Sequence, residues 1–358
     1  MENTLNQNKR MDTIDIAKGI GILFVIFAHV NYTPEVLVLI YSFHMPLFFI
    51  LSGVLFKREK YESFRTFIKR RLNTLILPYI FFYMAGLVYA YVSEQMYGDL
   101  FDITSEEYIQ YFLEMFISHR SATVINTPLW FVPCLFAVEI MYYFISGLKK
   151  KSLILPVCFL LTAFGWLLES GYLEFDNKAL PWSLDSALFA LSFYAIGNVF
   201  SPAVKDTIQR ISQHKQRTFI CLGLILICLL IWYPLAVMNG KITLGSKVLN
   251  NGFLLYATGI LGTMIILAVS LLIKKSRFLV FCGQSTFCIM GVHVMIRKYT
   301  LPKMYDAFDI PLYDKHILSE CIVPFIIVLM ITLALTLIYD KVQSYRTYRK
   351  ITSSGVSI

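Results

Sequence analysis

Long apolar stretches recur along almost the whole of this chain, and they constrain its fold more than any other feature. A helix that spans a membrane needs about 20 mainly apolar residues. Ten stretches have this character, and we expect each of them to form one spanning helix. They are residues 13–31, 34–56, 72–92, 128–148, 152–169, 183–201, 218–238, 249–273, 278–298 and 318–340.

The composition supports the same conclusion. Of the 358 residues, 57% are hydrophobic and only 15% are charged, whereas a soluble domain carries about 25% charged residues. No separate polar domain interrupts the stretches, so the sequence predicts a single all-α membrane domain over residues 1–358. The first stretch contains Asp15 and Lys18 and lacks a small-residue cleavage site, so we interpret it as a retained helix rather than a signal peptide.

The distribution of positive charge predicts the orientation of the bundle. Cytoplasmic segments of membrane proteins carry an excess of Lys and Arg. With both termini in the cytoplasm, the inner segments hold 23 of these residues, the outer segments hold 8, and Lys18 lies within a helix. This topology accounts for the net charge of +9, so nucleic acid is not an expected partner. The longest outer segment, residues 93–127, is read either as a short amphipathic helix beginning near Ser105 or as an ordinary loop.

Two ionisable residues, Lys18 and His29, lie within the first apolar stretch. A charged side chain near the bilayer centre costs roughly 2.5–3.5 kcal/mol, so such residues are usually paired or functional. Their spacing of three helical turns places both on nearly the same face, about 16 Å apart along the axis. Asp15 falls on this stripe as well and is expected to pair with Lys18.

Two further histidines lie in apolar stretches, His44 in the second and His293 in the ninth. Histidine is the side chain best suited to move a proton near neutral pH, although a lone buried histidine is more often a hydrogen-bonded core residue. We expect His29 and His293 at similar depth and His44 deeper by roughly 10 Å. Glu139, within the fourth stretch, is either a relay carboxylate or a hydrogen-bonded structural group.

The segment between the second and third stretches is the most basic part of the chain. Orientation and attraction to anionic lipid explain much of this charge. Arg70 and Arg71, at the start of the third stretch, also suit phosphate recognition, because a guanidinium group binds phosphate in a planar, bidentate manner. A donor that carries several phosphates, such as coenzyme A, would dock there from the cytosol.

The seven cysteines all fall in apolar segments and form no Cys-x-x-Cys pair. They are therefore interpreted as small buried apolar residues, and neither a disulfide framework nor a metal site is expected.

Several of these residues belong to motifs by which the chain resembles the membrane-bound acyltransferase-3 family. Among its members, sugar O-acetyltransferases akin to fucose 4-O-acetylase are the most similar. The motifs are residues 11–29, 43–53, 69–79 and 128–133, with a weaker match at 283–293. Many members carry Arg at the position of Lys18, and lysine keeps the charge but loses the bidentate fork.

The resemblance implies a ten-helix core that moves an acetyl or other short acyl group from cytosolic acyl-CoA to carbohydrate. His29 matches the essential first-helix histidine, which we expect to act as general base, and Arg70 and Arg71 match the basic donor-side motif. A covalent acyl-histidine intermediate is left open. In this interpretation His44 and His293, which line the path of the acyl group or acceptor, are catalytic candidates beside His29, and Lys18 binds the donor with the two arginines. The other residues of the substrate path are Asp15, Trp130 and Glu139.

The expected location is a bacterial plasma membrane, and the expected acceptor is a cell-surface or lipid-linked glycan. A transporter or glycan exporter with proton-relay histidines is the main alternative, because buried His, Lys and Glu also suit a proton-coupled carrier. A ligand sensor without turnover is the third. The sequence specifies neither the sugar nor the oligomeric state.

Overall fold

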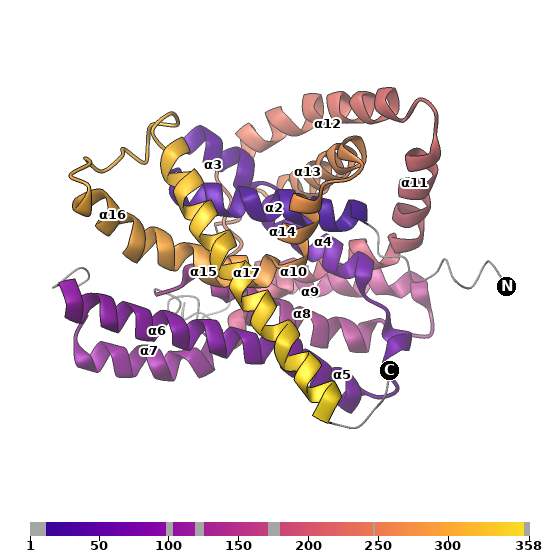
Figure 1. Ribbon diagram of the computed structural model, residues 1–358. Helices are drawn as coiled ribbons and strands as arrows, with labels where there is room; N and C mark the ends of the chain where they lie inside the picture. The colour runs from indigo at the N-terminus through magenta and orange to yellow at the C-terminus, as the bar shows by residue number, and fades with distance from the viewer. Residues whose placement is uncertain (1–11, 98–102, 119–124, 171–179, 246–247, 354–358) are drawn as a thin grey trace.

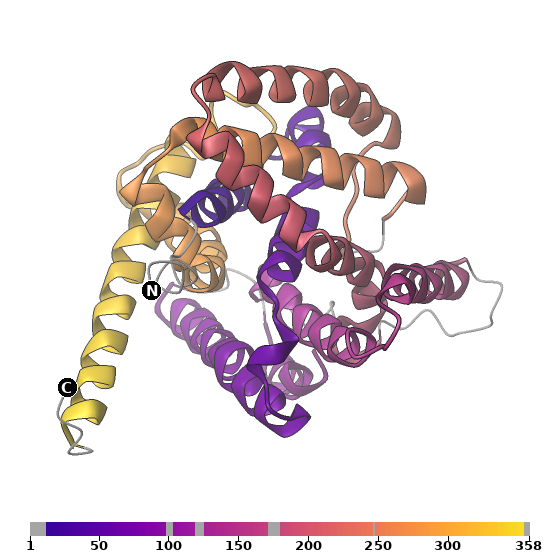
Figure 2. The same cartoon turned by 90° about the vertical axis from the view of Figure 1, so that its right-hand side faces the viewer.

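The computed structural model describes residues 12–97, 103–118, 125–170, 180–245 and 248–353. These residues form an all-α bundle that contains no β-strand within the described ranges, although Thr243 and Val248 form one isolated bridge. Figure 1 shows how the helices are arranged, and the turned view in Figure 2 shows that α12 and α17 both lie at its edge. The fold class predicted from the apolar stretches is confirmed.

Eight helical segments are long and apolar enough to span a membrane, and two bent helix pairs bring the number within the described residues to ten. Each expected stretch coincides with one of them. The elements are α2 (Asp12–Val30), α3 (Pro34–Tyr41) with α4 (His44–Leu55), α5 (Phe64–Arg71) with η3 (Leu72–Ile76) and α6 (Leu77–Tyr97), η5 (Thr127–Trp130) with α8 (Phe131–Ile145), η6 (Lys151–Leu153) with α9 (Ile154–Glu169), η7 (Pro181–Ser183) and α10 (Leu184–Val199) with α11 (Ser201–Gln213), α12 (Arg217–Asn239), α13 (Gly252–Ile273), α14 (Arg277–Gln284) with α15 (Thr286–Met295), η8 (Ile296–Thr300) and α16 (Leu301–Ala307), and α17 (Ile322–Ser353).

Two of the stretches expected as single helices are interrupted. The second is divided at Ser42, whose hydroxyl donates to the Leu39 carbonyl and accepts from the Trp232 indole N–H. Such bonds compete with the helical ladder. The ninth bends by 80° at Ser285, whose hydroxyl donates to Asp340. Both breaks matter to the site, because His44 begins the helix after the first and His293 lies beyond the second.

Two helix pairs approach so closely that glycine is required at the contact. A β-carbon at Gly53 on α4 would lie 2.0 Å from the Tyr194 carbonyl oxygen on α10, and one at Gly197 would lie 2.1 Å from the Ile50 carbonyl oxygen. On α2 and α14, Gly19 and Gly283 meet backbone carbonyl groups at 2.1 and 1.8 Å in the same way. Small residues allow such approach in membranes, so these contacts fix α2 and α4 relative to their neighbours.

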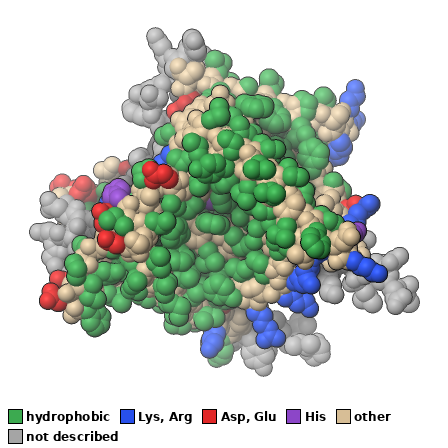
Figure 3. All heavy atoms as spheres, turned by 90° about the horizontal axis from the view of Figure 1, so that it is seen from above, with side chains coloured by type: hydrophobic (Ala, Val, Ile, Leu, Met, Phe, Trp, Pro, Cys, Tyr) green, Lys and Arg blue, Asp and Glu red, His purple; other side chains and the backbone are tan. Residues whose placement is uncertain are grey.

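Charged side chains gather at opposite ends of the bundle. Figure 3 shows Lys and Arg mostly at the end where α5 and α11 lie in Figure 1, and Asp and Glu mostly at the other end. We call the first of these the basic end. It includes the chain between α4 and α5, with η2 (Arg58–Lys60). Because cytoplasmic segments carry the excess of Lys and Arg, the orientation predicted from the sequence would place the basic end in the cytoplasm.

The acidic segment between the third and fourth stretches contains helix α7 (Ser105–Ile117), so the helical alternative is confirmed for its described residues. Thr104 and Glu107 form a capping box at its start. The Tyr83 hydroxyl of α6 donates to the Tyr111 carbonyl of α7 at 2.9 Å. Helix α7 therefore packs along α6, as Figure 1 also shows, rather than lying apart from the bundle.

We predict that Gly53→Ala lowers the thermal unfolding temperature of the purified protein, because its methyl group would collide with the α10 backbone. Overpacking of this kind costs about 1–3 kcal/mol. The matched control is Gly223→Ala on α12, where an added β-carbon meets nothing within 4 Å. Alanine favours helix over glycine by about 1 kcal/mol, so the control should unfold at an equal or higher temperature. Equal unfolding temperatures for the two variants would contradict the packing argument.

Candidate active site

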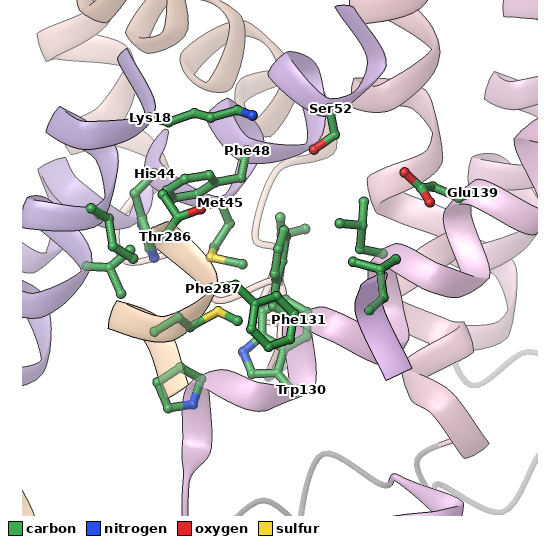
Figure 4. A pocket seen from close by; sticks show the side chains of 18 of the residues that line it. Lys18, His44, Met45, Phe48, Ser52, Trp130, Phe131, Glu139, Thr286 and Phe287 are labelled. Atoms are coloured by element: carbon green, nitrogen blue, oxygen red, sulfur yellow. The ribbon is translucent and has the colours of Figure 1, made fainter. Parts of the chain in front are cut away.

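A cavity of about 630 Å³ runs through the bundle, and we call it the central cavity. It follows the whole length of α4, from His44 past Phe48 and Ser52 to Leu55. Its volume lies within the range of about 300–1,000 Å³ that is typical of ligand pockets. Figure 4 shows side chains from α2, α4, α8 and α15 directed into it. The cavity therefore joins residues that are far apart in the sequence.

One mouth of the cavity lies at the basic end and is lined by several cations: Lys57, Lys60, Arg70 and Arg71. Tyr61 stands among them, since the guanidinium carbons of Arg70 and Arg71 lie 5.9 and 5.8 Å from its ring centre. Ser63 caps α5 by accepting from the Thr66 N–H, which begins the helix that presents both arginines. The structure thus places the two arginines at a mouth suited to an anionic ligand.

An ion pair crosses this part of the cavity. Arg71 Nε lies 2.7 Å from Glu139 Oε2, and the two side chains are only 19% and 5% exposed. The Tyr194 hydroxyl donates to the other carboxylate oxygen at 3.3 Å. Both members of the pair line the cavity. Glu139 therefore compensates the charge of Arg71, and the remaining positive charge of the mouth comes from Lys57, Lys60 and Arg70.

One face of helix α2 lines the cavity. Lys18, Ile22, Val25 and His29 all line it, at the spacing of successive turns of one helical face. Asp15 lies outside the lining, is 5% exposed, and accepts from the Gln284 amide of α14 at 3.3 Å. The stripe that the sequence predicted is thus a wall of the cavity, with Lys18 toward the basic end and His29 toward the other.

His44 enters the cavity from the break before α4. Its Nδ1 lies 2.8 Å from the Ile40 carbonyl oxygen, and the Tyr41 ring packs edge-on at 4.8 Å. A carbonyl can only accept, so the neutral ring carries its proton on Nδ1 and its Nε2 is an acceptor. The orientation of His44 is therefore determined by the turn that interrupts the second stretch.

His29 and His293 are neighbours, with their ring centres 5.2 Å apart. His293 is fully buried and its Nδ1 lies 2.9 Å from the Ile289 carbonyl oxygen. Of the two, only His29 is among the described residues that line the central cavity. His293 thus lies behind His29, whereas the sequence interpretation placed it along the acyl or acceptor path.

Trp130 lines the cavity at the start of α8, beside Phe131. The loop after α12 packs on its indole ring, because a β-carbon at Gly245 would lie only 2.6 Å from the ring. Lys241 on the same loop places its ammonium group 5.2 Å from the Tyr41 ring centre. This loop forms part of the cavity wall away from the basic end.

Sequence reasoning missed several residues of the cavity: Tyr41, Ser52, Lys241 and Gly245. Ser52 lies within the motif of residues 43–53, and the others carry no local signal. Lys57 and Lys60 belong to the basic segment between the second and third stretches, whose charge alone does not indicate that they line a cavity. No group of three or more His, Cys, Asp or Glu placed to hold a metal ion occurs among the described residues.

The chain matches the acyltransferase-3 family, described as an acyltransferase domain, over residues 11–340. It therefore belongs to this family of membrane acyltransferases, and the family assignment made from the motifs is confirmed. Neither a curated protein nor a solved structure matches the chain. The central cavity, which is lined by His29, Lys18 and Arg71, therefore lies within an enzyme domain.

We predict that removing either partner of the Arg71–Glu139 pair destabilises the protein more than removing both. Arg71→Leu leaves a buried carboxylate and Glu139→Leu leaves a cation, and breaking one side of a buried pair costs about 3–5 kcal/mol. The double variant should recover much of the loss in unfolding temperature. The control is Arg210→Ala, which breaks the exposed pair with Asp206, 79% and 56% exposed, and should change little. Additive losses in the double variant would contradict this view.

Proposed function

We propose that the protein is an O-acyltransferase that moves an acetyl or other short acyl group from cytosolic acyl-CoA to a hydroxyl of a cell-surface or lipid-linked glycan. The observation that carries the proposal is the central cavity, which connects a mouth lined by Lys57, Lys60 and Arg70 with the His29 imidazole. Family membership supplies the class of reaction. An alternative carrier function would not require acyl-CoA to bind.

The proposed site for the acyl donor is supported by the positive charges at the mouth and by the burial of the ion pair beyond them. Coenzyme A is a multiply phosphorylated molecule, and Arg70, Lys57 and Lys60, all exposed, offer charged hydrogen-bond donors for it at the mouth of the cavity. The Arg71–Glu139 pair lies deeper, where a neutral thioester arm would pass. Lys18 lies on the wall between this mouth and His29. Docking at the basic end implies that this end faces the cytosol.

The wall between the mouth and His29 is mainly apolar and includes Met45, Phe48, Phe131 and Met290. Such a lining suits an acyl chain or thioester and excludes water that would hydrolyse it. Ser52 and Thr286 add isolated hydroxyl groups to the same wall. The space thus favours passage of a short neutral group over passage of a free ion.

In the proposed reaction the acceptor hydroxyl lies against His29. The unprotonated ring nitrogen takes the hydroxyl proton while the oxygen attacks the thioester carbonyl carbon. The carbon–sulfur bond breaks, the thiolate of coenzyme A leaves, and the imidazolium returns the proton to it. His44 and Trp130, on the same cavity, would contact the acceptor. An acyl-histidine route remains the covalent alternative within this proposal.

The acceptor and the location are parts of the proposal. Enzymes akin to fucose 4-O-acetylase act on sugars, and the motif likeness of this chain supports a sugar hydroxyl as acceptor. A plasma membrane of bacterial type, with the basic end inside, matches the charge segregation along the bundle. The cavity wall near Tyr41 and Lys241, away from the basic end, would then lie toward the outer side and receive the glycan.

We predict that His29→Ala lowers acetyl transfer from labelled acetyl-CoA by about 10²–10⁴-fold, the usual contribution of a general base. Transfer is measured as label in membrane or surface glycan, with the protein in native membranes. His214→Ala, at an exposed histidine outside the cavity, is the control and should retain activity. Acetyl-CoA should also raise the unfolding temperature of the purified wild-type protein. Full activity of His29→Ala excludes His29 as the base, and no thermal response favours a carrier.

We predict that Arg70→Ala weakens coenzyme A binding by about tenfold or more, because a charge-assisted hydrogen bond to phosphate contributes about 1.5–3 kcal/mol. Isothermal titration calorimetry on the detergent-solubilised protein gives the dissociation constant. Lys150→Ala is the control, since Lys150 is an exposed residue outside the cavity lining in the loop after α8. An unchanged dissociation constant in Arg70→Ala would place the donor elsewhere.

A further inference from the structure

His293 carries a hydrogen-bonding feature that the proposed reaction does not use. Its Nδ1 lies 2.9 Å from the carbonyl oxygen of Ile289, one turn earlier on α15. Because that oxygen can only accept, a neutral His293 ring keeps its proton on Nδ1. The lone pair of the ring is therefore on Nε2, and this nitrogen is a hydrogen-bond acceptor.

This acceptor is buried and has no hydrogen-bond partner within the described part of the chain. His293 itself is 0% exposed. A buried polar atom without a partner costs about 1–3 kcal/mol, so such an atom in a well-packed helix calls for a partner. The surrounding α15 is otherwise packed, with Ile289 and Val294 almost fully buried.

A second imidazole ring, that of His29, lies beside His293. The centres of the two rings are 5.2 Å apart. At this separation one ring nitrogen can donate to the other at an ordinary distance of about 2.9 Å. The His29 imidazole has no hydrogen-bond partner of its own among the described residues, and its terminal torsion is broad. Rotation of the His29 ring about this torsion can therefore bring its N–H toward Nε2 of His293.

We propose that His293 is a positioning residue for His29: its Nε2 accepts one N–H of His29 and so leaves the other His29 nitrogen unprotonated toward the cavity. The proposal rests on the proposed function, in which that free nitrogen takes the acceptor proton. It follows the general arrangement in which a base is oriented by a third group behind it.

A histidine in this role has a physical advantage inside a membrane. A carboxylate behind His29 would add a buried charge, at a cost of several kcal/mol. The neutral His293 ring supplies the acceptor without net charge, because its own proton is held by the Ile289 carbonyl. Arg297 lies one turn beyond His293, on η8, and its guanidinium carbon lies 5.9 Å from the Tyr32 ring centre, so nearby positive charge also favours a neutral pair.

The kinetic test compares His293→Ala, His293→Gln and the control Val294→Ala in the full-length protein. Removing an orienting partner typically costs about 10–100-fold in activity. His293→Ala should lower kcat by this factor and leave KM for acetyl-CoA unchanged, and His293→Gln should recover part of kcat because its amide oxygen can accept. The double variant His29→Ala/His293→Ala should be no slower than His29→Ala, since residues that act as a unit are not additive. Full kcat in His293→Ala, or a further loss in the double variant, overturns the proposal.

A second measurement tests the proposed hydrogen bond between His29 and His293 without relying on activity. In protein labelled with ¹⁵N-histidine, the Nε2 resonance of His293, assigned by its absence in His293→Gln, should report a hydrogen-bonded acceptor in the wild type. In His29→Ala it should move to the position of a free acceptor. A resonance that does not move shows that His29 is not the donor. Absence of acetyl transfer in the wild type would instead refute the proposed function and leave the resonance to decide the contact.

Discussion

Polar groups inside an apolar bundle need a partner or a route to water, and this constraint organises the site. Lys18 and His29 lie on the one face of α2 that meets the central cavity. Arg71 is compensated by Glu139 at 2.7 Å. His44 and His293 each place Nδ1 within 3 Å of a carbonyl oxygen of their own helix or the preceding turn. Most of the costly residues of the sequence thus line the cavity, whereas His293 lies behind its wall.

Close backbone packing provides the rigid frame for this chemistry. Gly53 and Gly197 bring α4 against α10, and Gly19 and Gly283 bring α2 against α14. These contacts fix the two helices that carry His44 and His29. The break at Ser285 turns the chain by 80° before the helix that carries His293, and the break at Ser42 leaves His44 at the start of α4. Side chains held on such a frame keep a defined geometry for a positioned base.

Much of the architecture was predictable because the bilayer imposes a length and a polarity on each segment. The ten stretches, the one-sided stripe of α2 and the basic character of the cavity mouth all follow from residue type and helical spacing. The breaks within the second and ninth stretches did not, because they depend on bonds from Ser42 to Trp232 and from Ser285 to Asp340, which are far apart in sequence. Local patterns carry no information on such partners.

The sequence by itself determined the membrane class, which follows from composition, and the candidate residues His29, Arg70 and Arg71, which stand out by their place in apolar or basic segments and by motifs that resemble a known family. Only the tertiary structure decided which of them meet. It paired Glu139 with Arg71, placed His293 behind His29 rather than on the cavity wall, and brought Lys241 to the cavity. The reason is that helical spacing fixes the face on which a residue lies, whereas the neighbour of that face is set by how the helices pack.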